Sequence, residues 1–309
     1  MTTVALSDTQ SALGSTLAGS RWYVAAGVVF AAFYFVLTTW LTPRGLDRPA
    51  VVIGAPMVGL AVPVYVVLVG MCGFAATKIL GARDYLASLE VLCVGVAAWA
   101  LLGGTMDDWL ARFHRSATGA SRAPYSALML EYAVQIAAFA AGLFGIVIAI
   151  GSVGPPGTTW RERVTAHWPP LDRNEKAASG VLTVFVICAV AALAMLVFMG
   201  PRVAHTHQGQ VYFSIFAGFA IGTYAARSTL GRAAPIWYAL PPVVLGIVGV
   251  ILATMNPALP QPFAQINIIP PSALSRPLPI EIITVGIVAA SWMLRNLQHA
   301  APPQPAKSN

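Results

Sequence analysis

Long runs of apolar residues, separated by short polar connections, dominate the pattern along the chain. A helix needs about 20 predominantly apolar residues to cross the hydrocarbon core of a bilayer. Eight segments have roughly that length and carry few charges: 22–42, 51–77, 86–104, 126–151, 178–200, 210–227, 236–256 and 279–295. The pattern therefore predicts an all-α integral membrane protein, a polytopic bundle of about eight transmembrane helices with short loops.

These segments leave little of the chain for any other structure. Residues 1–21 form an N-terminal tail, and residues 298–309 form a proline-containing tail that is expected to be disordered. Residues 22–297 are predicted to form a single transmembrane helical domain, because no connection is long enough to fold as a soluble domain. A functional site is therefore expected inside the membrane or at its surface.

The amino-acid composition supports this class of protein. Hydrophobic residues make up 57% of the 309 residues and charged residues 9%, whereas an ordinary soluble domain has about 25% charged residues. These values exclude a soluble enzyme, a disordered protein and a disulfide-stapled secreted module. The three cysteines lie in apolar segments without metal-ligand spacing, so we interpret them as packing residues.

The net charge of +7 bears on partners and orientation. The lysines and arginines lie in short connections and form no cluster of the kind that binds nucleic acid, so we expect contact with anionic lipid instead. If the N-terminus is cytoplasmic, eleven Lys and Arg side chains lie on the cytoplasmic side and seven on the other. The positive-inside rule then favours a bacterial-type inner membrane protein with both termini in the cytoplasm.

Two carboxylates lie within predicted spans and are candidates for a transport or proton-carrying role. Glu90 is about one turn from the start of segment 86–104, and Glu131 is about one turn from the start of segment 126–151. A carboxylate inside a bilayer is costly unless it is protonated, paired or hydrated. Gln135 follows Glu131 by four residues and shares its helical face. The alternative interpretation is structural hydrogen bonding to a neighbouring helix.

A second polar group lies in the connections on the predicted outer side. His205 and His207 are two residues apart and face the same way in an extended segment, and His114, Asp107 and Asp108 lie on the same side. Imidazoles combined with a carboxylate suit zinc, copper or non-haem iron. The alternative is a set of hydrated interfacial residues without a metal. No histidine lies in mid-span to hold a haem, and no glycine-rich phosphate-binding loop marks a nucleotide site.

Small residues and prolines indicate how the helices pack. Gly218 and Gly222 are four residues apart, a spacing that lets two helices approach closely within the bundle or between subunits. Pro63 and the Pro241-Pro242 pair lie inside predicted spans, where proline frees a backbone carbonyl and can kink the helix. Broken helices also occur at the binding sites of transporters.

Three functions remain open at this point. The preferred one is an integral, non-catalytic subunit of a larger membrane complex, because the spans carry few charges and the loops are short. The second is a transporter of a small molecule or ion that uses the intramembrane carboxylates. The third is a membrane metalloenzyme or metal-handling protein with the outer His and Asp residues. Lipid and other membrane subunits are the expected partners, and the sequence shows no catalytic motif.

Overall fold

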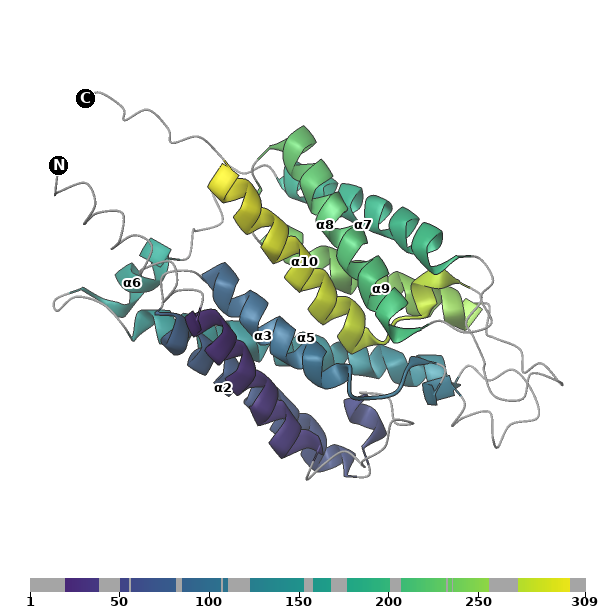
Figure 1. Ribbon diagram of the computed structural model, residues 1–309, viewed down its shortest axis with the longest axis horizontal. Helices are drawn as coiled ribbons and strands as arrows, with labels where there is room; N and C mark the ends of the chain where they lie inside the picture. The colour runs from purple at the N-terminus through teal and green to yellow at the C-terminus, as the bar shows by residue number, and fades with distance from the viewer. Residues whose placement is uncertain are drawn as a thin grey trace, which may run out of the picture.

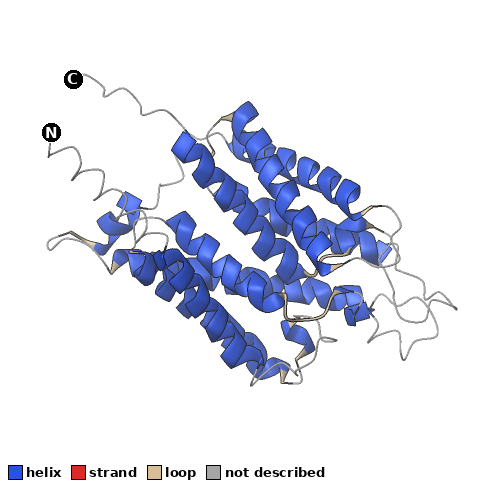
Figure 2. Cartoon of the chain, viewed as in Figure 1, coloured by secondary structure: helices blue, strands red, loops and turns tan. Residues whose placement is uncertain are grey.

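The fold was analysed in a computed structural model. It describes residues 20–38, 51–55, 57–81, 85–106, 108–110, 123–152, 158–167, 177–200, 207–231, 233–234, 236–255 and 272–300. Within these ranges the regular secondary structure is helical and includes no strand (Figure 2). The predicted class, an all-α membrane bundle, is therefore confirmed.

The long helices follow the predicted apolar segments in order. They are a first helix (Ser20–Thr38), α2 (Val58–Leu80), α3 (Tyr85–Ala100), α5 (Ala123–Gly151), α7 (Ala177–Met199), α8 (Gln208–Leu230), α9 (Ile236–Met255) and α10 (Pro279–Ala300). A short helix, α6 (Trp160–His167), lies between α5 and α7. The first helix ends in a π-helical turn, η1 (Tyr34–Thr38), and two 3₁₀ turns are η2 (Val52–Gly54) and η3 (Ala273–Ser275).

Six of the described helices are long and apolar enough to cross a membrane, fewer than the eight spans predicted. The two that fall short are α3 and α8. Helix α3 has 16 residues, which is about 24 Å of helix against a hydrocarbon core of about 30 Å. Most of α3 is buried, so it serves as a central helix of the bundle. Helix α8 has 23 residues, but Gln208 and Gln210 in its first turn and Arg227 and hydroxyl side chains toward its end make it less apolar.

The second predicted span, 51–77, is not one continuous helix. Residues 52–54 form the separate turn η2, and α2 begins only at Val58. Ala55 is extended, with φ −68° and ψ 144°, which is the conformation favoured by a residue that precedes proline, and Pro56 follows it. The proline therefore delays the start of α2.

The helices form two groups that follow the order of the chain (Figure 1). In the N-terminal group α2 packs chiefly on α5 and also on α3, and the first helix joins them through Phe33, which contacts Tyr65 and Trp99. In the C-terminal group α7 packs chiefly on α8, with α9 and α10 against them. The groups meet chiefly where α3 packs on α10, a contact more extensive than those of α3 with α2 or α5, and also where α5 contacts α9 and α10. We call this contact the seam.

Glycines allow the main helix pair of the N-terminal group to approach closely. A Cβ atom at Gly73 of α2 would overlap the carbonyl oxygen of Gly142 of α5. A Cβ atom at Gly145 of α5 would overlap the carbonyl oxygen of Gly70 of α2. The two backbones therefore touch, as small residues permit in membrane helices.

The main pair of the C-terminal group is built in the same way. A Cβ atom at Gly218 of α8 would lie 3.1 Å from the Cα of Ala191, and one at Gly222 would lie 3.0 Å from the carbonyl oxygen of Ile187. Both of these neighbours belong to α7. Gly218 and Gly222 thus face a helix of the same chain.

Basic side chains gather at one end of the bundle. The described residues include seven lysines and arginines: Arg21, Lys78, Arg161, Arg163, Arg227, Arg276 and Arg295. Six of them lie where α2, α5, α8 and α10 end and α3 and α9 begin, which we call the basic end. Arg276 is the exception; it is buried near the far end and donates to the carbonyl oxygen of Met199 at 2.8 Å.

Candidate functional site

Most of the carboxylates in the described part of the chain cap helices. Three of the five accept a hydrogen bond from the backbone N–H three residues earlier: Asp108 from Thr105 at 2.6 Å, Glu162 from Thr159 at 2.8 Å and Glu281 from Leu278 at 2.7 Å. A carboxylate is stabilised at a helix N-terminus by the unpaired N–H groups and the helix dipole. The other two are Glu90 and Glu131, the carboxylates that the sequence placed inside spans.

Glu131 is the centre of a hydrogen-bonded cluster that is closed to solvent. Its Oε1 accepts a hydrogen bond from Gln135 Nε2 at 2.6 Å, and its Oε2 accepts one from the backbone N–H of Ile53 at 3.0 Å. The Tyr65 hydroxyl donates to Gln135 Oε1 at 2.7 Å. All three side chains are fully buried. The cluster therefore ties α5 to α2 and to the η2 turn.

The sequence identified two members of this cluster and missed the other two. Glu131 and Gln135 share a face of α5, as their spacing indicates. Tyr65 and Ile53 come from segments about 70 to 80 residues away, so no local pattern points to them. A carboxylate with a donor on each oxygen is held firmly in place, and this arrangement favours the structural interpretation of Glu131.

Glu90 has a different environment, because it pairs across the seam. Arg295 of α10 places its NH1 atom 2.7 Å from Oε2 of Glu90 on α3, with the arginine side chain 29% exposed and the glutamate side chain 7% exposed. The sequence indicated a neighbouring helix as partner but did not identify Arg295. A partly exposed ion pair has a small net stability, since water solvates and screens its charges. The glutamate is nearly buried, however, so opening the pair costs more than opening a surface ion pair unless water or another cation reaches the Glu90 carboxylate.

The far end of the seam is also joined by polar contacts. The Tyr212 hydroxyl of α8 donates to the carbonyl oxygen of Ala97 at 3.3 Å, and Gln208 Nε2 lies 3.5 Å from the carbonyl oxygen of Ala100. Within the C-terminal group Gln208 Nε2 also lies 3.4 Å from Glu281 Oε1. Ala97 and Ala100 lie in the last turn of α3, and their carbonyl oxygens also accept backbone N–H groups of Leu101 at 2.9 Å and Gly103 at 3.0 Å. The hydrogen bonds across the seam are long, so each one is weak.

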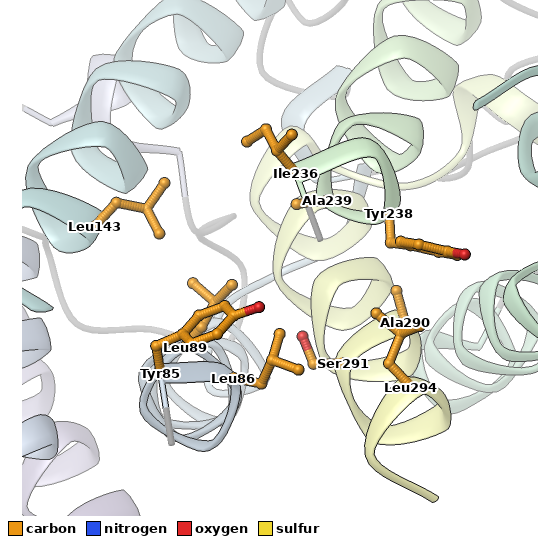
Figure 3. Close-up of a pocket in the computed structure, with 10 residues that line it drawn as sticks. All are labelled: Tyr85, Leu86, Leu89, Leu143, Ile236, Tyr238, Ala239, Ala290, Ser291 and Leu294. Carbon is orange, nitrogen blue, oxygen red and sulfur yellow. The ribbon is translucent and has the colours of Figure 1, made fainter. Parts of the chain in front are cut away.

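An apolar cavity lies in the seam and is lined in part by Leu89 and Leu294, the chain neighbours of Glu90 and Arg295 (Figure 3). Its walls come from α3, α5, α9 and α10: Tyr85, Leu86, Leu89, Leu143, Ile236, Tyr238, Ala239, Ala290, Ser291 and Leu294. The volume that water can reach is about 40 Å³, and the total empty space, which includes open solvent, is about 450 Å³. Because α3 and α9 contribute their first turns, the cavity lies toward the basic end.

The predicted metal ligands lie mostly outside the described residues, as is the case for His205, His114 and Asp107. His207 immediately precedes α8 and is exposed, and Asp108 caps the turn that begins at Thr105. Within the described ranges no three His, Cys, Asp or Glu side chains gather as a metal site would need. The metal site therefore stays a prediction.

Comparisons with profiles of known protein families, with curated proteins and with solved structures give no match. A helical membrane fold hosts many activities, so the fold alone does not select one. The seam and its cavity are therefore the basis on which a function is inferred.

Proposed function

We propose that the protein is a membrane carrier that binds a small, largely apolar molecule in the seam between its two helix groups. The observation that carries this proposal is the position of the cavity, which lies where the groups meet and not inside either one. In many carriers the substrate site lies between two helical units, and transport consists largely of one unit rocking against the other.

The contrast between contacts within the groups and contacts across the seam supports this proposal. Within the groups, α2 touches α5 and α7 touches α8 at glycines, with backbone against backbone. Among the described residues, the polar contacts across the seam include an ion pair at the basic end and long hydrogen bonds at the far end. Each group can therefore move as a unit while one end of the seam opens and the other stays closed.

In the proposed carrier the two intramembrane carboxylates have different roles. Glu90 lies at the seam and acts as a latch with Arg295, so its task is to open and close the basic end. Glu131 binds within the N-terminal group and keeps that group rigid. The function preferred from the sequence, a non-catalytic scaffold subunit, does not by itself account for a cavity between the two helix groups.

Cross-linking the seam tests the proposal. Lys78→Cys and Ser228→Cys, exposed positions at the basic end on opposite sides of the seam, are introduced together in a chain whose native cysteines are replaced by alanine. A reducible bifunctional thiol reagent joins them after reconstitution. Proteoliposomes are incubated with a small-molecule extract of the source cells, and uptake is measured by mass spectrometry. We expect the uncross-linked protein to take up a discrete set of compounds, the cross-linked protein to match empty liposomes, and reduction to restore uptake.

Lys78→Cys with Ser152→Cys is the matched control. These side chains lie 2.6 Å apart, and both belong to the N-terminal group, so the same reagent joins them without bridging the seam. This cross-link should leave uptake unchanged. Uptake that continues with the seam cross-linked, or uncross-linked protein that performs no better than empty liposomes, would contradict the proposal.

A further inference from the structure

We infer that the seam cavity takes a single-chain carboxylate of the fatty-acid class. The hydrocarbon chain lies among the apolar side chains, and the carboxylate lies toward the basic end, at Ser291 and Arg295. This inference rests on the proposed function, in that the cavity is the carrier's binding site, and it adds the chemical class of the molecule that is bound.

The size of the cavity favours a narrow chain over a ring. Its water-accessible volume is about 40 Å³, a few times the ~10–15 Å³ that one water requires and well below the ~150 Å³ cavity that holds a benzene molecule. Leucine, isoleucine and alanine side chains form most of its walls. The end of a hydrocarbon chain fits this space, and the remainder of the chain extends beyond it.

One polar group on the wall is left for a ligand to bind. Ser291 is 4% exposed and lines the cavity, and across the described part of the chain its hydroxyl makes no hydrogen bond. Figure 3 shows this hydroxyl pointing into the space between α10 and α3. By contrast, Ser214 and Thr284 donate to the carbonyl four residues earlier in their own helices. A ligand oxygen in the cavity would give Ser291 the partner it lacks.

Arg295 indicates that the polar head group of the ligand carries a negative charge. This residue lies four positions after Ser291, so the two share a face of α10. It is the more exposed partner of its ion pair, and five other cations lie at the same end of the bundle. A guanidinium binds a carboxylate through two parallel hydrogen bonds, so an anionic carboxylate suits this position better than a neutral head group.

Binding of such a ligand would act on the latch itself. The carboxylate competes with Glu90 for the guanidinium of Arg295, which joins α3 to α10. An arriving ligand therefore weakens the contact that closes the basic end of the seam. Its affinity should rise when Glu90 loses its charge and fall when Arg295 does, and a merely structural role of the ion pair does not predict these opposite changes.

Photo-crosslinking in nanodiscs tests the inference. The probe is a palmitic acid analogue with a diazirine near its methyl end, compared with the same chain as an alcohol and as an acyl chain of phosphatidylcholine. We expect the acid to label the segments around Leu86 and Leu294 at least tenfold more strongly than the alcohol, which is the loss expected for one charge-assisted hydrogen bond. Phosphatidylcholine should label lipid-facing side chains such as Phe185, which is 68% exposed.

Four variants complete the experiment. Arg295→Gln should lower labelling by the acid about tenfold, Ser291→Ala should lower it severalfold, and Glu90→Gln should raise it severalfold. Arg227→Gln, at the same end but on α8, should leave it unchanged. Equal labelling by acid and alcohol, or a fall in labelling with Glu90→Gln, would overturn the inference. If the acid binds as expected but the protein with the cross-linked seam still shows uptake, the carrier proposal is wrong and the binding site is supported. If cross-linking stops uptake but the acid does not bind as expected, only the assignment of the ligand to the fatty-acid class is wrong.

Discussion

Gly73→Ala is expected to lower the free energy of unfolding by about 2–3 kcal/mol, although it adds only one methyl group. The new Cβ would overlap the backbone carbonyl of Gly142, and a backbone atom cannot move aside as a flexible side chain can. Helices α2 and α5 must therefore separate along their contact. The measurement is unfolding in mixed micelles with increasing SDS, followed by tryptophan fluorescence.

Gly59→Ala is the matched control for this prediction. It makes the same change in the same helix, but a Cβ atom at Gly59 has no atom within 4 Å. Alanine favours helix over glycine, so this variant should be as stable as the original protein or up to about 1 kcal/mol more stable. Equal unfolding midpoints for the two variants would show that α2 and α5 do not pack at Gly73.

Glu131→Ala is expected to be still more damaging, with a loss of about 3–5 kcal/mol, because two buried donors lose their acceptor at about 1–3 kcal/mol each. It leaves the Gln135 amide and the N–H of Ile53 without their acceptor in a fully buried site. It also releases the η2 turn, so a cysteine placed at Val52, which is 2% exposed, should become reactive toward maleimide. The SDS unfolding midpoint and the rate of maleimide labelling are the two measurements.

The control replaces a carboxylate that also accepts a backbone hydrogen bond but lies at the surface. Glu162 caps α6 through Thr159 in an exposed position, so Glu162→Ala should cost only about 1 kcal/mol. It should leave the cysteine at Val52 unreactive. If Glu131→Ala is no more destabilising than Glu162→Ala, the buried cluster does not hold η2 in place.

The sequence predicts the helices well because each one must present an apolar surface to lipid or to its neighbours. Every predicted segment contains a helix. The errors occur where a local rule overrides the apolar pattern: Pro56 separates η2 from α2, and α3 is short because its burial in the bundle does not require a full span. Whether a helix is buried in this way depends on the helices around it, so the hydropathy pattern of its own residues does not reveal it.

The neighbours of each helix are harder to predict. In lipid, small residues and polar contacts determine which helices meet, because all of the helix surfaces are apolar. Gly218 and Gly222 could therefore be recognised from the sequence as packing residues. The partner of Glu90 could not, since Arg295 has the same appearance in the sequence as any basic residue that flanks a membrane helix. Ser291 gave no signal either, because most serines in membrane helices bond to their own backbone. Its importance appears only when the cavity beside it is known.

The central claim, that the two helix groups move against each other at the seam, is tested most directly by spin-label distances in nanodiscs. One pair of labels, at Lys78 and Ser228, spans the basic end, and a second pair, at Leu60 and Phe213, spans the far end; each pair joins exposed positions on α2 and α8. We expect two distances at the basic end, with Glu90→Gln shifting the population to the longer one while the far-end distance shortens. A single distance at each end, unchanged by Glu90→Gln, would contradict this account.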